Sequence, residues 1–224
     1  MTAIAQPLTE YSDPYCLREP AAAALLYDAP WRRFAAIGDS LSLGVSDPSP
    51  GYANLGWADR VSRILRLVHP DLAYLNTGRV GATTAQALTE QSRAMLDFGP
   101  DLLYVPSGAN DLVRREPDFE VIEHDLTRMY ELAVRVGAQP LAFTLGRAYV
   151  VPVFPDWRDR VRRVNDITRT LAAKYGAVLA DVWDHPLNDR ENLLSADGIH
   201  FSTSGQAVLA AEIVKQLAYR LGSA

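Results

Sequence analysis

The chain has 224 residues, of which 48% are hydrophobic and 22% are charged, and its formal net charge is −5. This length can enclose the core of one large domain, or at most two small ones. The acidic balance argues against the broad basic surface of a nucleic-acid binder. One cysteine, Cys16, excludes an intrachain disulfide framework and a multi-cysteine metal site. Imidazole chemistry has four candidates, His69, His124, His185 and His200.

The N-terminal region carries neither a membrane span nor the features of a secretory signal. Its longest purely apolar run, Ala21 to Tyr27, is far shorter than the roughly 20 residues that a transmembrane helix needs. Two acidic residues, Glu10 and Asp13, precede the first basic residue, Arg18, whereas a signal peptide begins with a positively charged segment. We therefore expect no transmembrane segment and a cytoplasmic protein.

Short apolar runs alternate with longer amphipathic stretches along the rest of the chain. Five runs have the character of buried strands: 33–37, 72–75, 102–105, 141–145 and 177–180. Five stretches show helical spacing of apolar residues: 57–68, 83–96, 119–133, 161–171 and 203–221. The alternation predicts a five-stranded parallel sheet that is covered by helices on both faces.

Two further expectations follow from this element order. Residues 1–32 match no strand of the sheet, so we interpret them as an extension that packs on, or precedes, a domain formed by residues 33–224. In open parallel sheets, ligands bind at the carboxyl ends of the strands. Functional residues are therefore expected in the loops that follow the predicted strands.

Ser40 lies in the first of these loops, within Gly38-Asp39-Ser40-Leu41. A serine between a strand end and a helix start exposes its hydroxyl close to backbone N–H groups. The spacing is not the G-x-S-x-G of an α/β-hydrolase nucleophile elbow, because Ser42 stands where the second glycine would be. A simple turn, in which Asp39 and Ser40 bond to the local backbone, is an alternative interpretation of the same residues.

The next two loops carry Gly81 and Asn110. Gly78 and Gly81 precede a predicted helix, but their spacing matches neither a dinucleotide fingerprint nor a P-loop. A glycine there lets the backbone turn an N–H toward a ligand, or serves only a tight turn. Asn110, in Ser107-Gly108-Ala109-Asn110-Asp111, can donate a hydrogen bond to an oxyanion, or can cap the following helix.

The loop before the last helix contains Asp197 and His200 in Asp197-Gly198-Ile199-His200. A carboxylate three residues before a histidine can orient the imidazole, which is then free to take a proton from Ser40 as a general base. The same pair is also compatible with half of a metal site or with a surface loop. His185, which follows the fifth predicted strand, is the most plausible rival base.

Taken together and in this order, the four segments resemble the motifs of the SGNH hydrolases, the GDSL-type esterase and lipase family. The resemblance covers about residues 33 to 221 and departs from the family pattern at none of the catalytic positions. It implies a flavodoxin-like three-layer α/β/α sandwich around a five-stranded parallel sheet. This agrees with the element count.

The resemblance also implies a role for each motif residue. Ser40 would be the nucleophile, His200 the general acid and base, and Asp197 its orienting partner. The oxyanion hole would consist of the backbone N–H groups of Ser40 and Gly81 and the side-chain amide of Asn110. This scheme requires no metal and no cofactor.

We therefore expect a serine esterase that hydrolyses esters of small to medium acyl groups through an acyl-serine intermediate. An acyltransferase or O-deacetylase acting on a sugar or lipid with the same triad is an alternative, and so is a non-catalytic binding domain of this fold. The expected partner is a small-molecule ester rather than nucleic acid, and the sequence indicates no oligomeric state. The loop 146–157, with Arg147, Tyr149, Phe154 and Trp157, is a candidate wall of the substrate pocket; the alternative is that its aromatic residues cover the sheet and Arg147 is solvated.

Overall fold

The computed structural model describes residues 8–222 and contains one parallel sheet. Its strands lie in the order β2-β1-β3-β4-β5, and every neighbouring pair is parallel. The strands are β1 (Arg33–Ala36), β2 (Ala73–Asn76), β3 (Leu102–Tyr104), β4 (Gln139–Phe143) and β5 (Val178–Ala180). This is the flavodoxin-like strand order, in which the chain reverses direction across the sheet between β1 and β3. The predicted five-stranded parallel sheet is confirmed.

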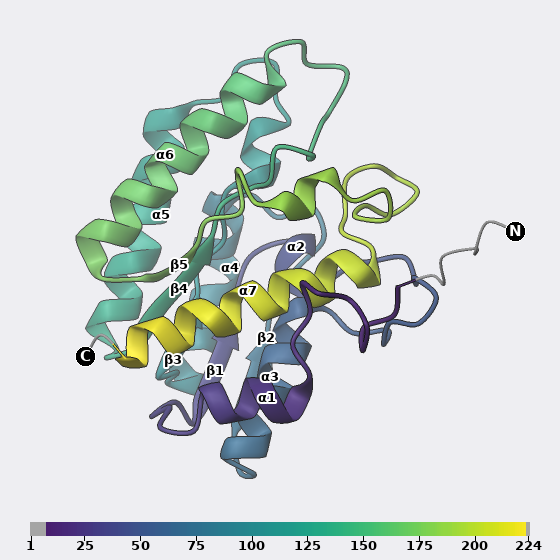
Figure 1. The fold of residues 1–224 in the computed structure, drawn as a ribbon. Coiled ribbons are helices and arrows are strands. Elements are labelled where there is room, and N and C mark those ends of the chain that lie inside the picture. Colours follow the sequence, from purple (N-terminus) through teal and green to yellow (C-terminus); the bar gives the residue numbers. More distant parts are fainter. Residues whose placement is uncertain (1–7, 223–224) are drawn as a thin grey trace, which may run out of the picture.

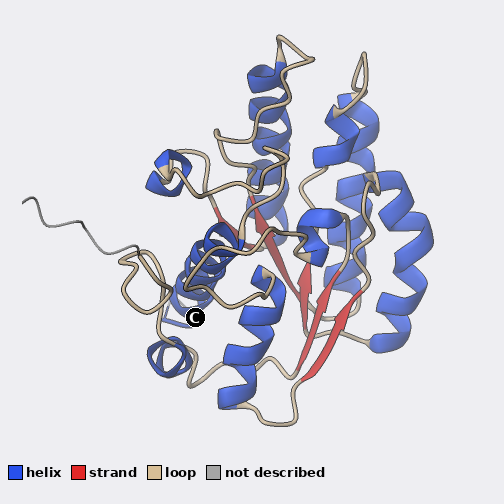
Figure 2. Ribbon diagram, turned by 90° about the vertical axis from the view of Figure 1, so that its right-hand side faces the viewer, coloured by secondary structure: helices blue, strands red, loops and turns tan. Residues whose placement is uncertain are grey.

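Helices cover both faces of the sheet and complete the three layers (Figures 1 and 2). One layer contains α1 (Glu19–Leu25), α3 (Trp57–Val68) and α7 (Thr203–Gly222), which pack on one another. The opposite layer contains α4 (Thr84–Phe98), α5 (Phe119–Arg135) and α6 (Trp157–Tyr175). The remaining elements are the four-residue helix α2 (Ser40–Leu43) and the 3₁₀ turns η1 (Ala109–Leu112) and η2 (Pro186–Asp189). No helix in residues 8–222 is long and apolar enough to cross a membrane.

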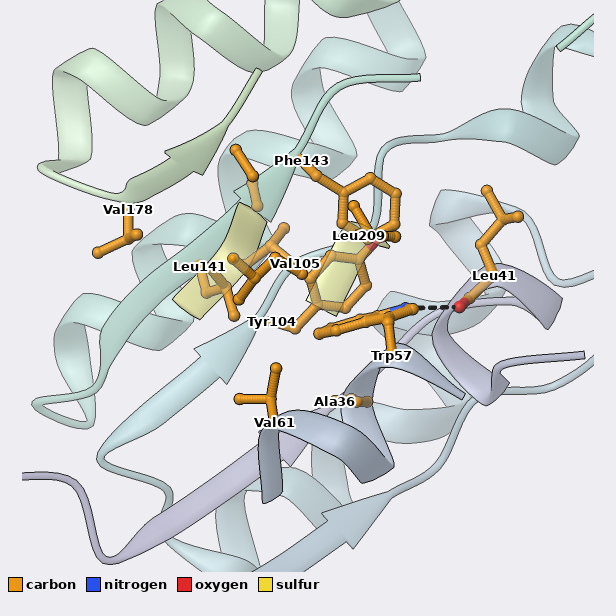
Figure 3. Packing of buried hydrophobic residues seen from close by; sticks show 14 of the residues in the cluster. Ala36, Leu41, Trp57, Val61, Tyr104, Val105, Leu141, Phe143, Val178 and Leu209 are labelled. Carbon is orange, nitrogen blue, oxygen red and sulfur yellow. Dashed lines mark hydrogen bonds between the residues drawn. The ribbon is translucent and has the colours of Figure 1, made fainter. Parts of the chain in front are cut away.

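An aromatic cluster at the centre of the core supports the start of α2. The Trp57 ring meets Tyr104 edge-on at a centroid distance of 4.7 Å, and the Tyr104 ring stacks on Phe143 at 5.0 Å (Figure 3). The Trp57 indole N–H donates to the carbonyl of Leu41 at 2.8 Å. Because a buried indole needs such a partner, the bond fixes the helix that begins with Ser40 against the core.

The fourth strand differs from its predicted range. It spans Gln139 to Phe143 instead of 141–145. Pro140, which lacks the N–H of a central strand residue, makes the start of this strand hard to recognise in the sequence. The structure accommodates it because the flanking Gln139 N–H donates to the Asp101 carbonyl at 2.8 Å and so begins the ladder.

The segment 8–32 packs on the layer formed by α3 and α7 (Figure 1). It contributes α1 and buries Ala22, Leu26 and Trp31 in the hydrophobic core. The sequence predicted no helix here, because the run of alanines in α1 carries little periodicity. Residues 1–7 lie outside the described residues, and the division of the chain at residue 33 stays a prediction.

Candidate active site

Ser40 is the first residue of α2, immediately beyond the carboxyl end of β1. The turn into this helix requires a glycine, because Gly38 has φ of 129° and a Cβ there would lie 2.7 Å from the Cβ of Pro106. The Ser40 side chain is largely buried, with 6% of the residue exposed. Its hydroxyl is therefore fixed at the edge of the sheet where ligands of this fold class bind.

Asp39 shapes the same turn by capping α2. Its Oδ1 accepts hydrogen bonds from the backbone N–H groups of Leu41 at 2.9 Å and Ser42 at 3.4 Å. Burial raises the pKa of Asp39 to about 6, and the charge of Asp111 contributes in the same direction. The residue next to the serine is thus a structural carboxyl group whose charge is costly to bury.

His200 reaches Ser40 from the loop between η2 and α7. Its Nε2 lies 2.8 Å from Ser40 Oγ, and its Nδ1 lies 2.6 Å from Asp197 Oδ2. A carboxylate only accepts hydrogen bonds, so Nδ1 carries the proton and Nε2 of the neutral ring accepts from the serine hydroxyl. The three predicted catalytic side chains therefore form one continuous hydrogen-bonded chain.

Asp197 is held in place by its own loop. Its Oδ1 accepts from the backbone N–H groups of Ile199 at 2.8 Å and His200 at 3.0 Å. Partial burial alone would raise the pKa of Asp197, but the hydrogen bonds from the His200 ring and from these two amides outweigh it and lower that pKa. The carboxylate is therefore ionised at neutral pH, as a group that orients and stabilises an imidazolium must be.

Asn110 and Gly81 lie on the other side of Ser40. The Asn110 Nδ2, in η1, is 3.2 Å from Asp39 Oδ2 and 3.1 Å from the carbonyl of Ala82. The amide is thus located between the turn that carries Ser40 and the turn that carries Gly81. Gly81 has φ of 77°, a conformation that favours glycine and orients the peptide of this turn. The structure thus brings Asn110 to the turns that carry Ser40 and Gly81, and the oxyanion hole itself stays a prediction.

A clamp around the His200 loop was not predicted from the sequence. Asp47 Oδ2 accepts from the Ala196 N–H, and the Asp47 N–H donates to Ser195 Oγ, both at 2.8 Å. The Asp47 carbonyl accepts from the Thr203 N–H at 2.9 Å. These bonds tie the loop after α2 to both ends of the segment that carries Asp197 and His200. Asp47 is 148 or more residues away in sequence, so no local pattern indicates the pairing.

Gln91 is a second positioning residue that sequence analysis missed. Its side-chain amide bonds to both sides of Gly38, accepting from the N–H at 2.8 Å and donating to the carbonyl at 2.7 Å. It also accepts from the Thr77 hydroxyl at 3.0 Å, so one buried side chain joins the loops after β1 and β2. A glutamine on the core-facing side of an amphipathic helix is the signal that could have revealed it.

His185 does not approach Ser40. Its Nδ1 accepts from the Leu187 N–H at 3.0 Å, and its Nε2 lies 3.4 Å from Glu212 Oε1. The histidine that the structure brings to the serine is His200, and His185 is used in capping η2.

An apolar hollow lies beside the triad, and we call it the inner pocket. Its cavity volume is only about 10 Å³, about the space of one water molecule, so its side chains nearly fill it. Its lining residues are Leu41, Phe143, Thr144, Leu145, Gly146, Ala148, Tyr149, Asn188, Leu194, Ile199 and Phe201. Leu41 follows Ser40 and Ile199 precedes His200, so a group attached to the reacting carbonyl has an apolar space beside it. Arg147 does not line the inner pocket. Its guanidinium is paired with Asp189, with Nη2 2.7 and 2.6 Å from the two carboxylate oxygens.

The fold and this arrangement of side chains define an ester hydrolase of the SGNH type. The sequence model of the GDSL-like Lipase/Acylhydrolase family matches residues 36–208. The chain therefore belongs to the GDSL-like lipase/acylhydrolase family and is a carboxylic ester hydrolase. None of the curated proteins compared with the chain matches it.

Solved structures of esterases share the fold. The α/β hydrolase LAE5 from the metagenome of Lake Arreo, Spain, is 21% identical over 86% of this chain and 97% of its own, with a TM-score of 0.68. The lipase/acylhydrolase from Enterococcus faecalis is 22% identical over 84% of this chain and 96% of its own, with a TM-score of 0.65. The acetylxylan esterase Axe2 from Geobacillus stearothermophilus is 17% identical over 83% and 94%, with a TM-score of 0.66. At these identities the similarity concerns the fold.

Proposed function

We propose that the protein is a serine esterase that cleaves esters through an acyl-serine intermediate formed on Ser40. The observation that carries this proposal is the hydrogen-bonded chain from Ser40 through His200 to Asp197, with distances of 2.8 and 2.6 Å. A serine hydroxyl is a weak nucleophile until an adjacent base removes its proton, and this geometry supplies the base.

In the first half of the reaction, Ser40 Oγ attacks the ester carbonyl carbon while its proton passes to His200 Nε2. The negative charge that develops on the carbonyl oxygen is stabilised by the N–H groups of Ser40 and Gly81 and by the amide of Asn110. Asp197 stabilises the imidazolium. When the tetrahedral intermediate collapses, the bond to the alcohol breaks and His200 returns the proton to the leaving oxygen.

In the second half, a water molecule attacks the acyl-serine. His200 takes a proton from this water, and the same donors stabilise the second oxyanion. Collapse releases the carboxylic acid and returns the proton to Ser40 Oγ, so the enzyme is regenerated. The apolar walls of the inner pocket and its cavity volume of about 10 Å³ favour small acyl groups as substrates, at the lower end of the expected range.

The test is hydrolysis of p-nitrophenyl acetate and butyrate by purified protein and by two variants. We expect Ser40→Ala and His200→Ala each to reduce kcat/KM by at least about 1,000-fold, because the first removes the nucleophile and the second removes the base that activates it. Ser92→Ala on α4 and His124→Ala on α5 are matched controls and should retain wild-type activity. A Ser40→Ala or His200→Ala variant with half of the wild-type activity contradicts the proposal.

A further inference from the structure

A second hollow, which we call the outer pocket, adjoins the inner pocket at Tyr149. Tyr149 lines both spaces. The outer pocket has a cavity volume of about 350 Å³, against about 10 Å³ for the inner pocket. The larger space is therefore separated from the catalytic serine by residues that include one aromatic side chain.

The walls of the outer pocket suit an alkyl or acyl chain. Phe154, Trp157 and Trp183 line it together with Tyr149, and the rings of Phe154 and Trp157 stack at a centroid distance of 6.0 Å. Val161, from the core-facing side of α6, lines it too. Such walls gain free energy by removing apolar surface from water, whatever the exact shape of the chain.

Tyr149 is held in a fixed position between the two spaces. Its ring packs edge-on against Trp157 at a centroid distance of 5.1 Å, and its carbonyl accepts from the Trp157 indole N–H at 2.8 Å. The preceding residue is fixed as well, because the Ala148 N–H donates to Asn188 Oδ1 at 3.1 Å. Because the backbone at Tyr149 is held by these bonds and its ring by Trp157, the ring acts as a wall rather than as a mobile side chain.

Tyr149 lines the inner pocket together with Leu41, which follows Ser40, and Ile199, which precedes His200. Burial raises the pKa of Tyr149 above its usual value, and the carboxylates of Asp39 and Asp197 raise it further. Asp39 precedes the nucleophile and Asp197 belongs to the triad, so the tyrosine lies within reach of their field. The inner pocket thus extends from the residues that adjoin Ser40 and His200 to this ring.

We propose that Tyr149 limits the length of the acyl chain by closing the inner pocket against the outer pocket. Short acyl chains end at the ring, and longer chains require the space behind it. When the tyrosine side chain is shortened, the two pockets join and the aromatic walls of the outer pocket receive the end of the chain. This inference rests on the proposed acylation of Ser40.

The main experiment compares the p-nitrophenyl esters of acids with 2, 4, 6, 8, 10 and 12 carbons. We expect the wild-type enzyme to have its highest kcat/KM at 2 or 4 carbons and Tyr149→Ala to have its highest value at 8 or more. Each methylene that becomes buried contributes about a fourfold gain. The ratio of the eight-carbon to the four-carbon ester should therefore rise by at least about tenfold. Such a gain cannot come from partial unfolding, which lowers activity toward all esters.

Three further variants define the role of the ring. Tyr149→Phe keeps the ring and should keep the short-chain preference. Tyr27→Ala removes an exposed tyrosine far from both pockets and should leave the profile unchanged. In the Tyr149→Ala background, Trp183→Ala should reduce the gain for long chains, because Trp183 lines the outer pocket but not the inner one. A wild-type preference for eight or more carbons, or an unchanged profile in Tyr149→Ala, overturns the inference.

A binding experiment separates this inference from the proposed function. Trp157 and Trp183 line the outer pocket, so their fluorescence reports its occupancy by sodium octanoate. We expect octanoate to bind Ser40→Ala/Tyr149→Ala at least about tenfold more tightly than Ser40→Ala. Absence of esterase activity in the wild type, combined with this tighter binding, refutes the acyl-serine mechanism while the connection of the pockets stands. Equal binding by the two variants refutes the connection.

Discussion

Asp39 serves several neighbours of the catalytic serine at the scale of single residues. One of its oxygens caps the helix that begins with Ser40, and the other accepts from the Asn110 amide. The proposed nucleophile and the side-chain donor of the proposed oxyanion hole are therefore positioned by the same carboxyl group. This explains why an aspartate precedes the serine even though it does not contact the His200 ring.

The Asn110 amide permits a direct prediction. We expect Asn110→Ala to lower kcat for p-nitrophenyl butyrate by about 100- to 1,000-fold with a much smaller change in KM, because an oxyanion donor acts mainly in the transition state. Steady-state kinetics at pH 7.5 provide the measurement. Asn54→Ala, which alters an exposed loop residue, is the control. An Asn110→Ala variant within threefold of the wild-type kcat would remove this residue from the oxyanion hole.

At the scale of elements, three segments that are distant in sequence meet around the loop before α7. Arg190 Nη2 is 2.6 Å from Asp13 Oδ2, and the Tyr52 hydroxyl donates to the same oxygen at 2.6 Å. The Asp13 side chain is fully buried and that of Arg190 is 8% exposed. Burial alone would raise the pKa of Asp13, but the bonds from Arg190 and Tyr52 lower it. The N-terminal segment is thereby joined to the loop that leads to Asp197.

Breaking this ion pair should destabilise the protein substantially. We expect Asp13→Asn to reduce the free energy of unfolding by about 3–5 kcal/mol, because it leaves the Arg190 charge buried without its carboxylate. Urea unfolding followed by circular dichroism measures the loss. Glu19 lies in the same N-terminal segment and forms an exposed ion pair with Arg63 of α3. Glu19→Gln should therefore reduce the free energy of unfolding by less than about 1 kcal/mol. Equal effects of the two substitutions would show that the Asp13 pair contributes no more than a surface bridge.

The sequence predicts elements and motifs well and long-range contacts poorly. Buried strands and amphipathic helices leave periodic patterns, and the loops after them hold Ser40, Gly81, Asn110 and His200. The start of β4 was predicted two residues too late, because Pro140 is not typical of a central strand. Asp47 and Gln91 were missed because many of their partners are backbone groups of other loops. Every residue type carries such groups, so the sequence does not indicate which of them will be bonded. The order of the motifs predicted which side chains meet at the site. The contacts of Asp47 and Gln91 that hold their loops in place are visible only in the structure.

At the scale of the whole molecule, the buried Asp39 carboxyl group makes stability depend on pH. Its pKa of about 6 in the folded protein exceeds the ordinary value of 3.8, so the folded state binds this proton more tightly than the unfolded state. The resulting stabilisation is complete below about pH 4 and is lost as the pH rises through 6. Above that range the ionised group costs up to about 3 kcal/mol.

Asp39→Asn removes this dependence. We expect the stability of the variant relative to the wild type to increase by up to about 3 kcal/mol between pH 4 and pH 7, since asparagine does not titrate. Urea unfolding at half-unit pH intervals measures the difference. Asp71→Asn, in an exposed turn, is the matched control. A constant difference between Asp39→Asn and the wild type across this range contradicts the raised pKa.

The distance along the chain between Ser40 and His200, 160 residues, has a consequence for biosynthesis. A ribosome delivers the serine 160 residues before the histidine, so the two can meet only after the intervening strands have been made. A nascent or truncated chain therefore holds a serine without its base. Under the proposed mechanism, hydrolysis therefore begins only after the segment that carries His200 has been synthesised and has folded against the turn that carries Ser40.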